Sequence, residues 1–407
     1  MDPPTHFPKY DTVTLGEYRA SGSFGAVFGV SLCDTKKRVT SNGYVIKLMA
    51  EEEAKYELDQ LKTIQDQLEG IELSDRMVIH TCPVPLDKMA NSKQKLPACS
   101  SLVPEVGLVF EDAGVDMLEL INNGRPPLSV RVMQELEQFC YFFHLLSLKK
   151  VNHGDIKIEN IIYGPTGFKL IDWGLAESYE TSAKMVREKE PPKYHFTRNP
   201  VPYFPPMVNC YRAIMNGEVV TDAHIDMLTT KQVTTRYELF QLTGRYATIH
   251  RVVYKKTLKK VLKWGLDPKN HEEYRRLMIT KLDAYMIGQF LFHLLDNWNT
   301  QLSDDHHPLL KKVLNKAIIW LIRTAITPDL RVVPTAGKLY QMLTRWLFNN
   351  PELSKELGIA KGAVVSDTAN ARSTMIITTT NKKTKRDETD GEKPSTRPLK
   401  RNRKKLG

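Results

Sequence analysis

The amino-acid sequence predicts an α+β fold, with a small β-rich lobe first and a larger, mostly helical lobe after it. Apolar and polar residues alternate around glycines over residues 13–50, which is typical of strands and hairpins. Residues 129–150 form a long, strongly apolar segment rich in Phe, Tyr and Leu, which indicates the core helix of a second lobe. A chain of 407 residues with 41% hydrophobic and 26% charged residues can bury such a core.

One helix is expected directly after the early strands. Residues 51–68 place Tyr56, Leu61, Ile64 and Leu68 at helical spacing within a highly charged run. Residues 84–102 are polar and contain proline, which indicates a loop, and residues 105–114 are typical of a strand that ends at a turn.

The chain divides into an extension, a folded unit and a tail. The folded unit contains an irregular, proline-rich stretch followed by predicted helices, which we interpret as an insertion. The expected boundaries are 1–12 for the extension, 13–350 for the folded unit, about 13–113 and 114–350 for its lobes, about 178–280 for the insertion and 351–407 for the tail.

The net charge of +11 is concentrated near the C-terminus. Residues 381–407 carry eleven Lys or Arg against four Asp or Glu, so they hold +7 of the total. They end in the basic string KRNRKK from Lys400 and lack apolar periodicity, so we expect disorder. Such a string is a candidate nuclear import signal, or an anchor for nucleic acid or an acidic protein partner.

No segment predicts secretion or a membrane partner. The start of the chain has prolines and charges where a signal peptide needs a basic patch and an apolar run. The longest apolar stretch, Ala317–Ile326, is much shorter than the ~20 residues that span a bilayer. The five cysteines form no C-x-x-C pair, which indicates neither a disulfide framework nor a zinc site. We expect an intracellular protein of the nucleus or cytoplasm.

The first candidate functional residues lie in the predicted β-rich lobe. The glycines of Gly22-Ser23-Phe24-Gly25-Ala26-Val27 would let the backbone approach phosphate groups closely, although such hairpins are common. Lys47 follows the apolar run Gly43-Tyr-Val-Ile and would face this loop. On the expected helix after it, Glu57 is the candidate ion-pair partner of Lys47, and Glu53 is the alternative.

The most informative residues lie around a predicted hairpin. The string His153-Gly-Asp-Ile-Lys-Ile-Glu-Asn160 precedes it, and Ile171-Asp172-Trp173-Gly174 follows it. This layout directs Asp155, Lys157, Asn160 and Asp172 toward one point. Phosphoryl transfer needs such a set: a carboxylate to orient the hydroxyl, oxygen ligands for Mg²⁺ and a cation for the γ-phosphate.

These strings resemble the catalytic loop and metal-binding motif of eukaryotic protein kinases. The resemblance extends along most of the chain, and its landmarks come in the order expected for that family. They are Gly22–Val27 for the glycine-rich loop, Lys47, Leu108–Ala113 for the gatekeeper and hinge, His153–Asn160, Asp172–Gly174, Asp283–Gly288 for the buried aspartate helix, and Asp329–Thr335 for the late arginine motif.

The resemblance implies a protein-kinase-like two-lobe fold and transfer of the γ-phosphate of ATP to Ser or Thr of protein substrates. Asp155 would orient the substrate hydroxyl, Lys157 would stabilise the transferred group, and Lys47 would be held by Glu57. Asn160 and Asp172 would bind Mg²⁺, or Mn²⁺ in its place. The residues implied to contact ATP are Gly22, Ser23, Phe24, Gly25, Val27, Val45, Lys47, Glu111 and Ala113.

Several positions depart from the usual pattern. Ala20 replaces the first glycine of the loop, and Trp173 replaces the usual Phe of the metal motif. Gly154 stands where many kinases have the arginine that receives a phosphorylated activation loop, so we expect activity without such phosphorylation. In this His-Gly-Asp variant the chain resembles vaccinia-related and casein-kinase-one-like kinases. The irregular segment after Asp172 is similar to divergent kinases of large DNA viruses, for which the virion would be a further location.

Three alternative interpretations remain. His-Gly-Asp followed by Ile-Asp-Trp also resembles the aminoglycoside and choline kinases, which phosphorylate small molecules. A pseudokinase scaffold is the second alternative, although every residue needed for phosphoryl transfer is present. The third makes nucleic-acid binding the main function, through the tail and the basic stretch 245–263.

Overall fold

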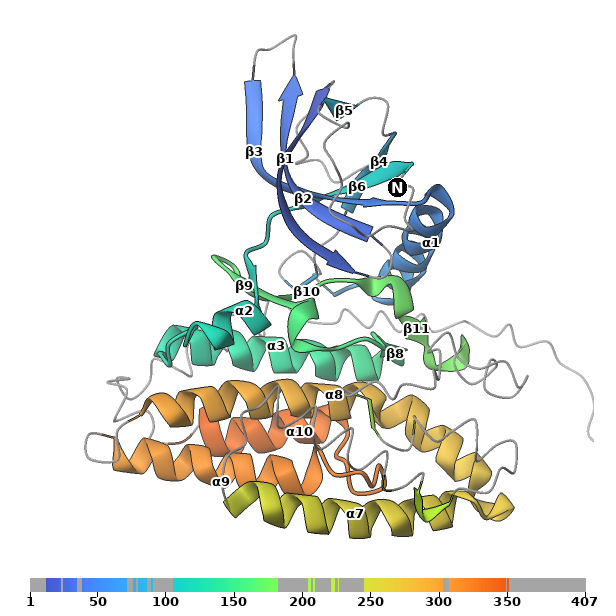
Figure 1. Ribbon diagram of the computed structural model, residues 1–407, viewed down its shortest axis with the longest axis vertical. Helices are drawn as coiled ribbons and strands as arrows, with labels where there is room; N and C mark the ends of the chain where they lie inside the picture. The colour runs from blue at the N-terminus through green and yellow to red at the C-terminus, as the bar shows by residue number, and fades with distance from the viewer. Residues whose placement is uncertain are drawn as a thin grey trace, which may run out of the picture.

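A computed structural model gives the structure of most of the folded unit, with a sheet-containing lobe above a helical lobe (Figure 1). The predicted extension, apart from Thr12, and the predicted tail lie outside the described residues. The described residues are 12–22, 25–34, 39–71, 76–77, 80–85, 89–90, 105–181, 204–205, 208, 221–223, 226, 245–302, 307–348 and 350.

The first lobe is built on a six-stranded sheet with the order β4-β6-β3-β2-β1-β5. Neighbouring strands are antiparallel, except that β5 pairs parallel to β1. The strands are β1 (Thr12–Gly22), β2 (Gly25–Asp34), β3 (Val39–Met49), β4 (His80–Pro85), β5 (Met89–Ala90) and β6 (Val106–Glu111). The strands predicted over 13–50 and 105–114 are therefore confirmed.

The loop predicted over residues 84–102 is wrong in part, because β4 extends into it and β5 lies within it. Proline misled the prediction here. Pro83 and Pro85 lie in β4, which is an edge strand, and an edge strand tolerates residues that cannot donate a backbone hydrogen bond.

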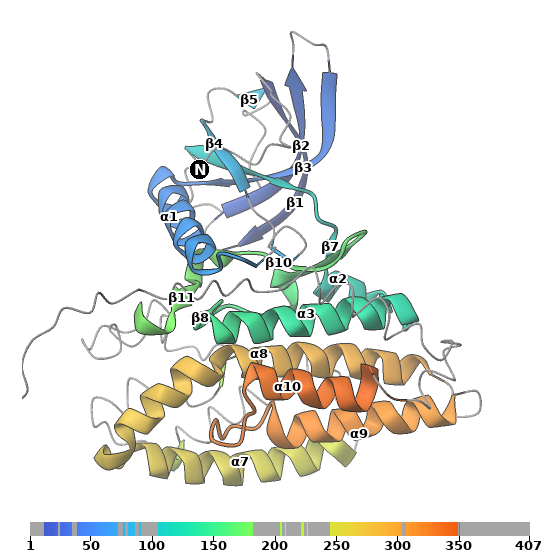
Figure 2. The same ribbon diagram turned by 180° about the vertical axis from the view of Figure 1, so that it is seen from behind.

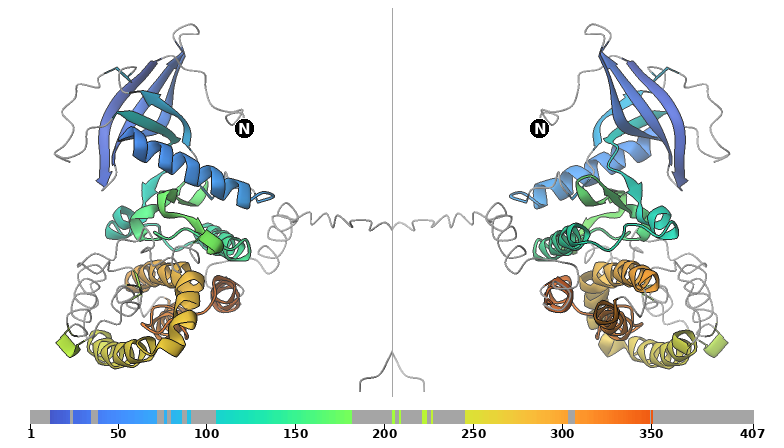
Figure 3. Two further views of the ribbon diagram at one scale, coloured as in Figure 1. Left: turned by 90° about the vertical axis from the view of Figure 1, so that its right-hand side faces the viewer. Right: turned by 90° about the vertical axis from the view of Figure 1, so that its left-hand side faces the viewer.

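Helix α1 (Glu51–Gln67) confirms the predicted helix and packs beside the sheet (Figure 3). Its buried residues are Ala54, Glu57, Leu61 and Ile64, while Tyr56, which the pattern placed on the apolar face, is only half-buried. Met49, Val106 and Leu108 of the sheet form an apolar cluster with Ala54. Ile46 and Leu48 belong to a separate cluster. Because strand side chains alternate between faces, Lys47 lies on the opposite face of β3 from Ile46 and Leu48.

The second lobe is mainly helical, and one large apolar cluster fills it. Helix α3 coincides with the predicted apolar segment, and the Ser129 hydroxyl caps its first turn by accepting a hydrogen bond from the Val132 N–H. The helices are α2 (Met117–Asn122), α3 (Val130–Leu148), α7 (Arg245–Gly265), α8 (His271–Gln301), α9 (Pro308–Thr324) and α10 (Ala336–Leu343), with one π-turn over Thr344–Phe348 and a 3₁₀ turn over Pro268–Asn270. Within the described ranges, no helix combines the length and apolar character needed to cross a membrane.

The C-terminal part of the predicted insertion belongs to the core of the helical lobe. Helix α7 buries Tyr254, Leu258 and Val261 in the large apolar cluster. The expected boundary at residue 280 falls inside α8, which begins at His271. Helix α7 leaves Lys256, Lys260 and Lys263 exposed, while its buried residues recur at helical spacing between them.

Short strands and turns lie between the sheet and the long helices (Figure 2). They form a three-stranded sheet, β10-β9-β7, and a two-stranded sheet, β11-β8. The strands are β7 (Val115–Asp116), β8 (Val151–Asn152), β9 (Ile161–Gly164), β10 (Gly167–Leu170) and β11 (Glu177–Ser178). The chain after β6 runs against this layer, since a Cβ added at Gly164 would lie 2.0 Å from the Ala113 carbonyl oxygen.

Candidate functional site

The β9–β10 hairpin brings two sets of polar residues to one end. Ile161 pairs with Leu170 at its open end, and the Ile171 N–H donates to the Asn160 carbonyl oxygen at 3.0 Å. The 3₁₀ turn η2 (Ile158–Asn160) enters the hairpin there, and Asp172 follows its exit before η3 (Trp173–Leu175). The hairpin predicted from the sequence is therefore confirmed, and Asn160 and Asp172 leave it as near neighbours.

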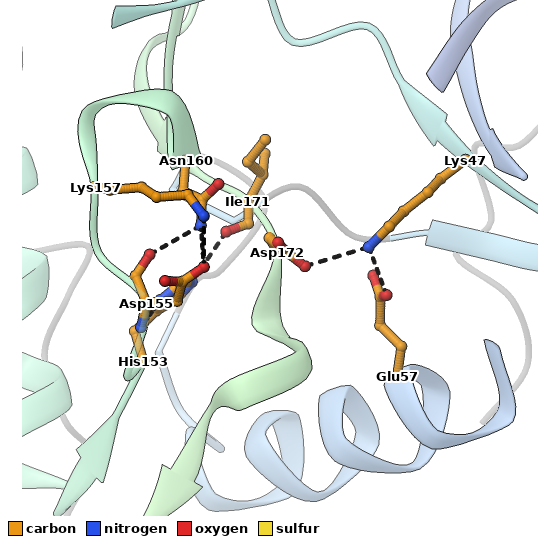
Figure 4. A network of polar contacts seen from close by, with 8 residues as sticks. All are labelled: Lys47, Glu57, His153, Asp155, Lys157, Asn160, Ile171 and Asp172. Atoms are coloured by element: carbon orange, nitrogen blue, oxygen red, sulfur yellow. Dashed lines mark hydrogen bonds and ion pairs between the residues drawn. The ribbon is translucent and has the colours of Figure 1, made fainter. Parts of the chain in front are cut away.

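Asp155 is the centre of a compact local network (Figure 4). Its Oδ2 accepts hydrogen bonds from Lys157 Nζ and from Asn160 Nδ2, each at 2.9 Å. The same Asn160 nitrogen also donates to the Asp155 carbonyl oxygen at 2.9 Å. Asp155 is 6% exposed, so its orientation is fixed by these contacts and by the surrounding backbone.

The loop that carries Asp155 is anchored to helix α8. Asp283 accepts from the His153 N–H at 2.6 Å through Oδ2 and from the Gly154 N–H at 3.0 Å through Oδ1. Burial raises the pKa of Asp283 to about 6, and these two backbone donors oppose that rise. Gly154 has φ of 80°, in the left-handed region where glycine is least strained, so glycine suits this turn better than a larger residue.

His153 joins the loop to the segment after β10. Its Nε2 lies 3.0 Å from the Ile171 carbonyl oxygen, and its Nδ1 lies 3.3 Å from the Asp155 backbone nitrogen. A carbonyl only accepts and an amide N–H only donates, so the ring is neutral with its proton on Nε2. Burial lowers the pKa of His153 to about 4, which agrees with this tautomer. The Trp173 ring contacts the imidazole edge-on at 4.7 Å between centroids.

Lys47 connects the sheet, α1 and Asp172. Its Nζ lies 2.7 Å from Glu57 Oε2 and 3.2 Å from Asp172 Oδ1. The expected Lys47–Glu57 pair is therefore present, and Glu53 on the preceding turn is exposed. Burial lowers the pKa of Lys47, but the negative charges of Asp172 and Glu57 outweigh that effect and raise it overall. The ammonium group therefore stays charged.

The two groups of residues meet at Asp172. Burial raises the pKa of this carboxyl, but the positive charges of Lys47 and, more weakly, Lys157 lower it overall. Lys157 belongs to the Asp155 network, so both groups act electrostatically on the same carboxylate. Asp172 has φ of 62° and ψ of 65°, a conformation that few residues other than glycine adopt and that is frequent at functional sites.

The residues expected to contact a nucleotide come from strands β1, β2, β3 and β6 and from the segment that follows β6. Val27 on β2 pairs in register with Lys47, and Val45 pairs with Phe110 of β6. Glu111 ends β6 and is exposed, while Ala113 is buried. Gly22 and Gly25 pair at the tip of the β1–β2 hairpin, and Ser23 and Phe24 lie outside the described residues.

The expected metal ligands offer one carboxylate and one amide oxygen. The Asn160 amide nitrogen is engaged by Asp155, which leaves the amide oxygen directed away from Asp155 (Figure 4). Two oxygen ligands on adjacent segments suit Mg²⁺, which keeps several water ligands and needs few from protein. The part of the chain described here holds no group of three or more His, Cys, Asp or Glu residues arranged for a metal ion.

Sequence reasoning missed several contacts that hold the site. Asp283 was named only as a landmark, yet it binds the loop backbone at two points. Arg331 had no identified partner, and the structure pairs it with Asp329 at 2.8 and 2.7 Å. Asp329 and Arg331 are only two residues apart in the sequence. This spacing alone does not predict a bidentate ion pair.

Comparison with known proteins gives no assignment: no family model matches the sequence, and no curated protein matches it significantly. The function must therefore be argued from the residues and their geometry.

Proposed function

We propose that this chain is an ATP- and Mg²⁺-dependent protein serine/threonine kinase with a protein-kinase-like two-lobe fold. One observation carries the proposal. Lys47 contacts both Glu57 and Asp172, although these residues come from β3, α1 and the exit of the β9–β10 hairpin. A lysine held in this way beside a metal-type carboxylate is the arrangement that phosphate binding requires.

The proposed division of labour follows from the contacts. Asp155 lies where a carboxylate can accept the proton of a Ser or Thr hydroxyl, and two donors hold it in one orientation. The hydroxyl oxygen forms a bond to the γ-phosphorus of ATP while the bond from that phosphorus to the bridging oxygen of ADP breaks. Lys157 lies beside Asp155 and can neutralise charge on the transferred group.

Asn160 and Asp172 are proposed to hold Mg²⁺, which when bound supplies positive charge to the β- and γ-phosphates. Lys47 would exchange its contact with Asp172 for phosphate oxygens, while Glu57 continues to hold its ammonium group. Glu57 thus acts through Lys47 and is a positioning residue.

The arrangement of the lobes supports the proposed fold. A mainly antiparallel sheet with helix α1 beside it stands above a helical lobe, and the hairpin layer with Asp155 and Asp172 lies between them (Figures 1 and 2). Ligand sites commonly form at such junctions. The chain segment from β6 to β7 is the connection between the lobes, and Glu111 and Ala113 lie on it.

We also propose that activity needs no phosphorylation of the segment after β11. Gly154 supplies no guanidinium, and its positive φ fits glycine, so the loop is held by Asp283 rather than by a phosphate-dependent contact.

The test is transfer of label from [γ-³²P]ATP to casein, histone and myelin basic protein, with wild type beside Asp155→Asn and with phosphoamino-acid analysis. We expect Mg²⁺-dependent labelling of Ser or Thr by wild type, before and after phosphatase treatment, and labelling reduced at least about a hundredfold for the variant. Equal labelling by the two chains would contradict the proposal.

A parallel assay with choline, ethanolamine and aminoglycosides addresses the small-molecule alternative. Labelling of these compounds with none of protein would replace the proposed substrate class. ATP binding in a thermal shift without any transfer would favour the scaffold.

A further inference from the structure

A second concave site lies on the helical lobe. It is a pocket of 360 Å³ between the C-terminal end of α3, the chain just after β11, the first half of α8 and the loop before α10. Its charged lining consists of Arg276, Lys281, Arg331 and Glu273. None of the residues of the proposed catalytic site lines it.

The positive charge of this pocket is only partly compensated. Arg276 binds Glu273 through two hydrogen bonds of 2.7 and 2.6 Å, and Arg331 binds Asp329 through two of 2.8 and 2.7 Å. Lys281 instead donates to a backbone oxygen, that of Val333, at 2.8 Å. Among the described residues, Lys281 has no carboxylate within ion-pair distance.

The surroundings of Lys281 make its charge costly. Burial lowers the pKa of its ammonium group, and the positive charge of Arg276 lowers it further. An anion in the pocket would offset both effects. Because the two arginines are already paired, one negative charge is enough to balance the lining.

Two exposed apolar residues directly follow lining residues of this pocket in the sequence. Leu148 is 59% exposed and Val332 is 51% exposed, the highest values among the exposed large hydrophobic residues of the described part of the chain. Leu148 follows the lining residue Ser147, and Val332 follows Arg331. Exposed apolar residues next to a polar pocket are typical of protein interaction sites.

We propose that this pocket is a docking site for an acidic segment of a protein partner, with an Asp or Glu carboxylate at Lys281 and an apolar side chain against Leu148 and Val332. A single carboxylate matches the one uncompensated charge, and the apolar neighbours favour a peptide over a small anion. Arg276 and Arg331 keep their own carboxylate partners, and their positive charges add to the attraction of the acidic segment.

Binding of a fluorescein-labelled peptide, Gly-Ser-Leu-Glu-Leu-Ser-Gly, to the full chain tests this site by fluorescence anisotropy. We expect saturable binding that weakens about tenfold when the peptide Glu is replaced by Gln. Lys281→Met should weaken it similarly, Lys281→Arg should preserve it, and Leu148→Ser should weaken it severalfold. The matched control is Lys256→Met, because Lys256 is an exposed lysine of α7 outside the pocket.

Thermal unfolding of each variant separates loss of binding from loss of fold, since Lys281 also bonds the Val333 carbonyl oxygen. Leu148→Ser removes no polar contact and keeps the test decisive if Lys281→Met is unstable. Equal binding by wild type and Leu148→Ser, or no binding by folded wild type, would overturn the proposal. Preference for a phosphoserine peptide over the Glu peptide would also overturn it, in favour of phosphate recognition. Asp155→Asn should bind the peptide normally, so failure of docking and failure of catalysis are distinguishable.

Discussion

The two halves of the candidate site are held together in different ways. Asp155, Lys157 and Asn160 lie within one short stretch, bond one another directly and share a backbone anchor on Asp283. Lys47, Glu57 and Asp172 come from three separate elements, and Lys47 and Asp172 are 125 residues apart. The first half is assembled by local chain geometry, whereas the second exists only while α1 packs on the sheet.

This difference separates the contacts on which each half depends. Moving α1 by one helical turn would separate Glu57 from Lys47 but leave the Asp155 network intact. The opposite change, release of the loop from Asp283, would disorder Asp155 while Lys47 kept Glu57. Substitutions in each half should therefore have separable effects.

The largest loss of activity is expected in the half formed by Asp155, Lys157 and Asn160. Asp155→Asn keeps the shape of the side chain but removes the acceptor of the substrate proton, so kcat should fall on the order of 10²–10⁴-fold. Steady-state kinetics with ATP and casein measure this. Glu159→Gln is the matched control, because Glu159 is exposed four residues after Asp155 and should retain wild-type kcat. A similar fall in both variants would mean that the turn, not the carboxylate, matters.

Substitutions in the half formed by Lys47, Glu57 and Asp172 should reduce activity by graded amounts. Lys47→Met removes the cation and should lower kcat/KM for ATP about 10²–10³-fold. Glu57→Gln leaves Lys47 its contact with Asp172, so we expect a smaller loss of about ten- to a hundredfold. The double variant should be no worse than Lys47→Met, since Glu57 acts through the lysine. Additive losses would show that Glu57 has an independent role.

Asp283, which anchors the loop that carries Asp155, should make activity depend on pH. Because the pKa of Asp283 is raised to about 6, protonation below that pH weakens acceptance from the His153 and Gly154 N–H groups, and kcat should fall. Asp283→Asn should have low activity throughout and lack this acidic limb. An unchanged limb in the variant would assign it to another group.

Protonation of Asp283 should lower activity but raise the free energy of unfolding. The folded protein binds the Asp283 proton more tightly than the unfolded chain, whose carboxyl keeps its ordinary value of 3.8. The contribution of Asp283 to the free energy of unfolding therefore rises as pH falls from about 6 toward 4. Urea unfolding of wild type and Asp283→Asn across this range measures the difference.

The smallest effect on activity is expected at Trp173, which directly follows Asp172 in the sequence. Trp173 is 2% exposed, and its indole N–H donates to the Leu170 carbonyl oxygen at 3.2 Å. Trp173→Phe removes this bond and some volume, so the free energy of unfolding should fall by about 1–3 kcal/mol, as measured in urea. The kcat should change little, because His153 keeps its bond to Ile171. A large loss of kcat would mean that the indole orients Asp172.

Local sequence patterns were enough to predict the kind and order of the main elements and the spacing of the loop residues. Hydrophobic periodicity and hairpin patterns are local, so β1 to β3, α1, α3 and the β9–β10 hairpin were predictable. Asp155, Lys157 and Asn160 were also predictable as a group, because they lie within six consecutive residues that end in one 3₁₀ turn.

The pairings between distant elements, in contrast, depend on tertiary packing. Glu53 and Glu57 lie one helical turn apart, and the burial of Ala54, Leu61 and Ile64 turns Glu57 rather than Glu53 toward Lys47. The anchoring by Asp283 and the place of α7 in the core were likewise undetermined. Such contacts depend on how whole elements pack, and no local pattern records the direction in which a packed helix presents its polar residues.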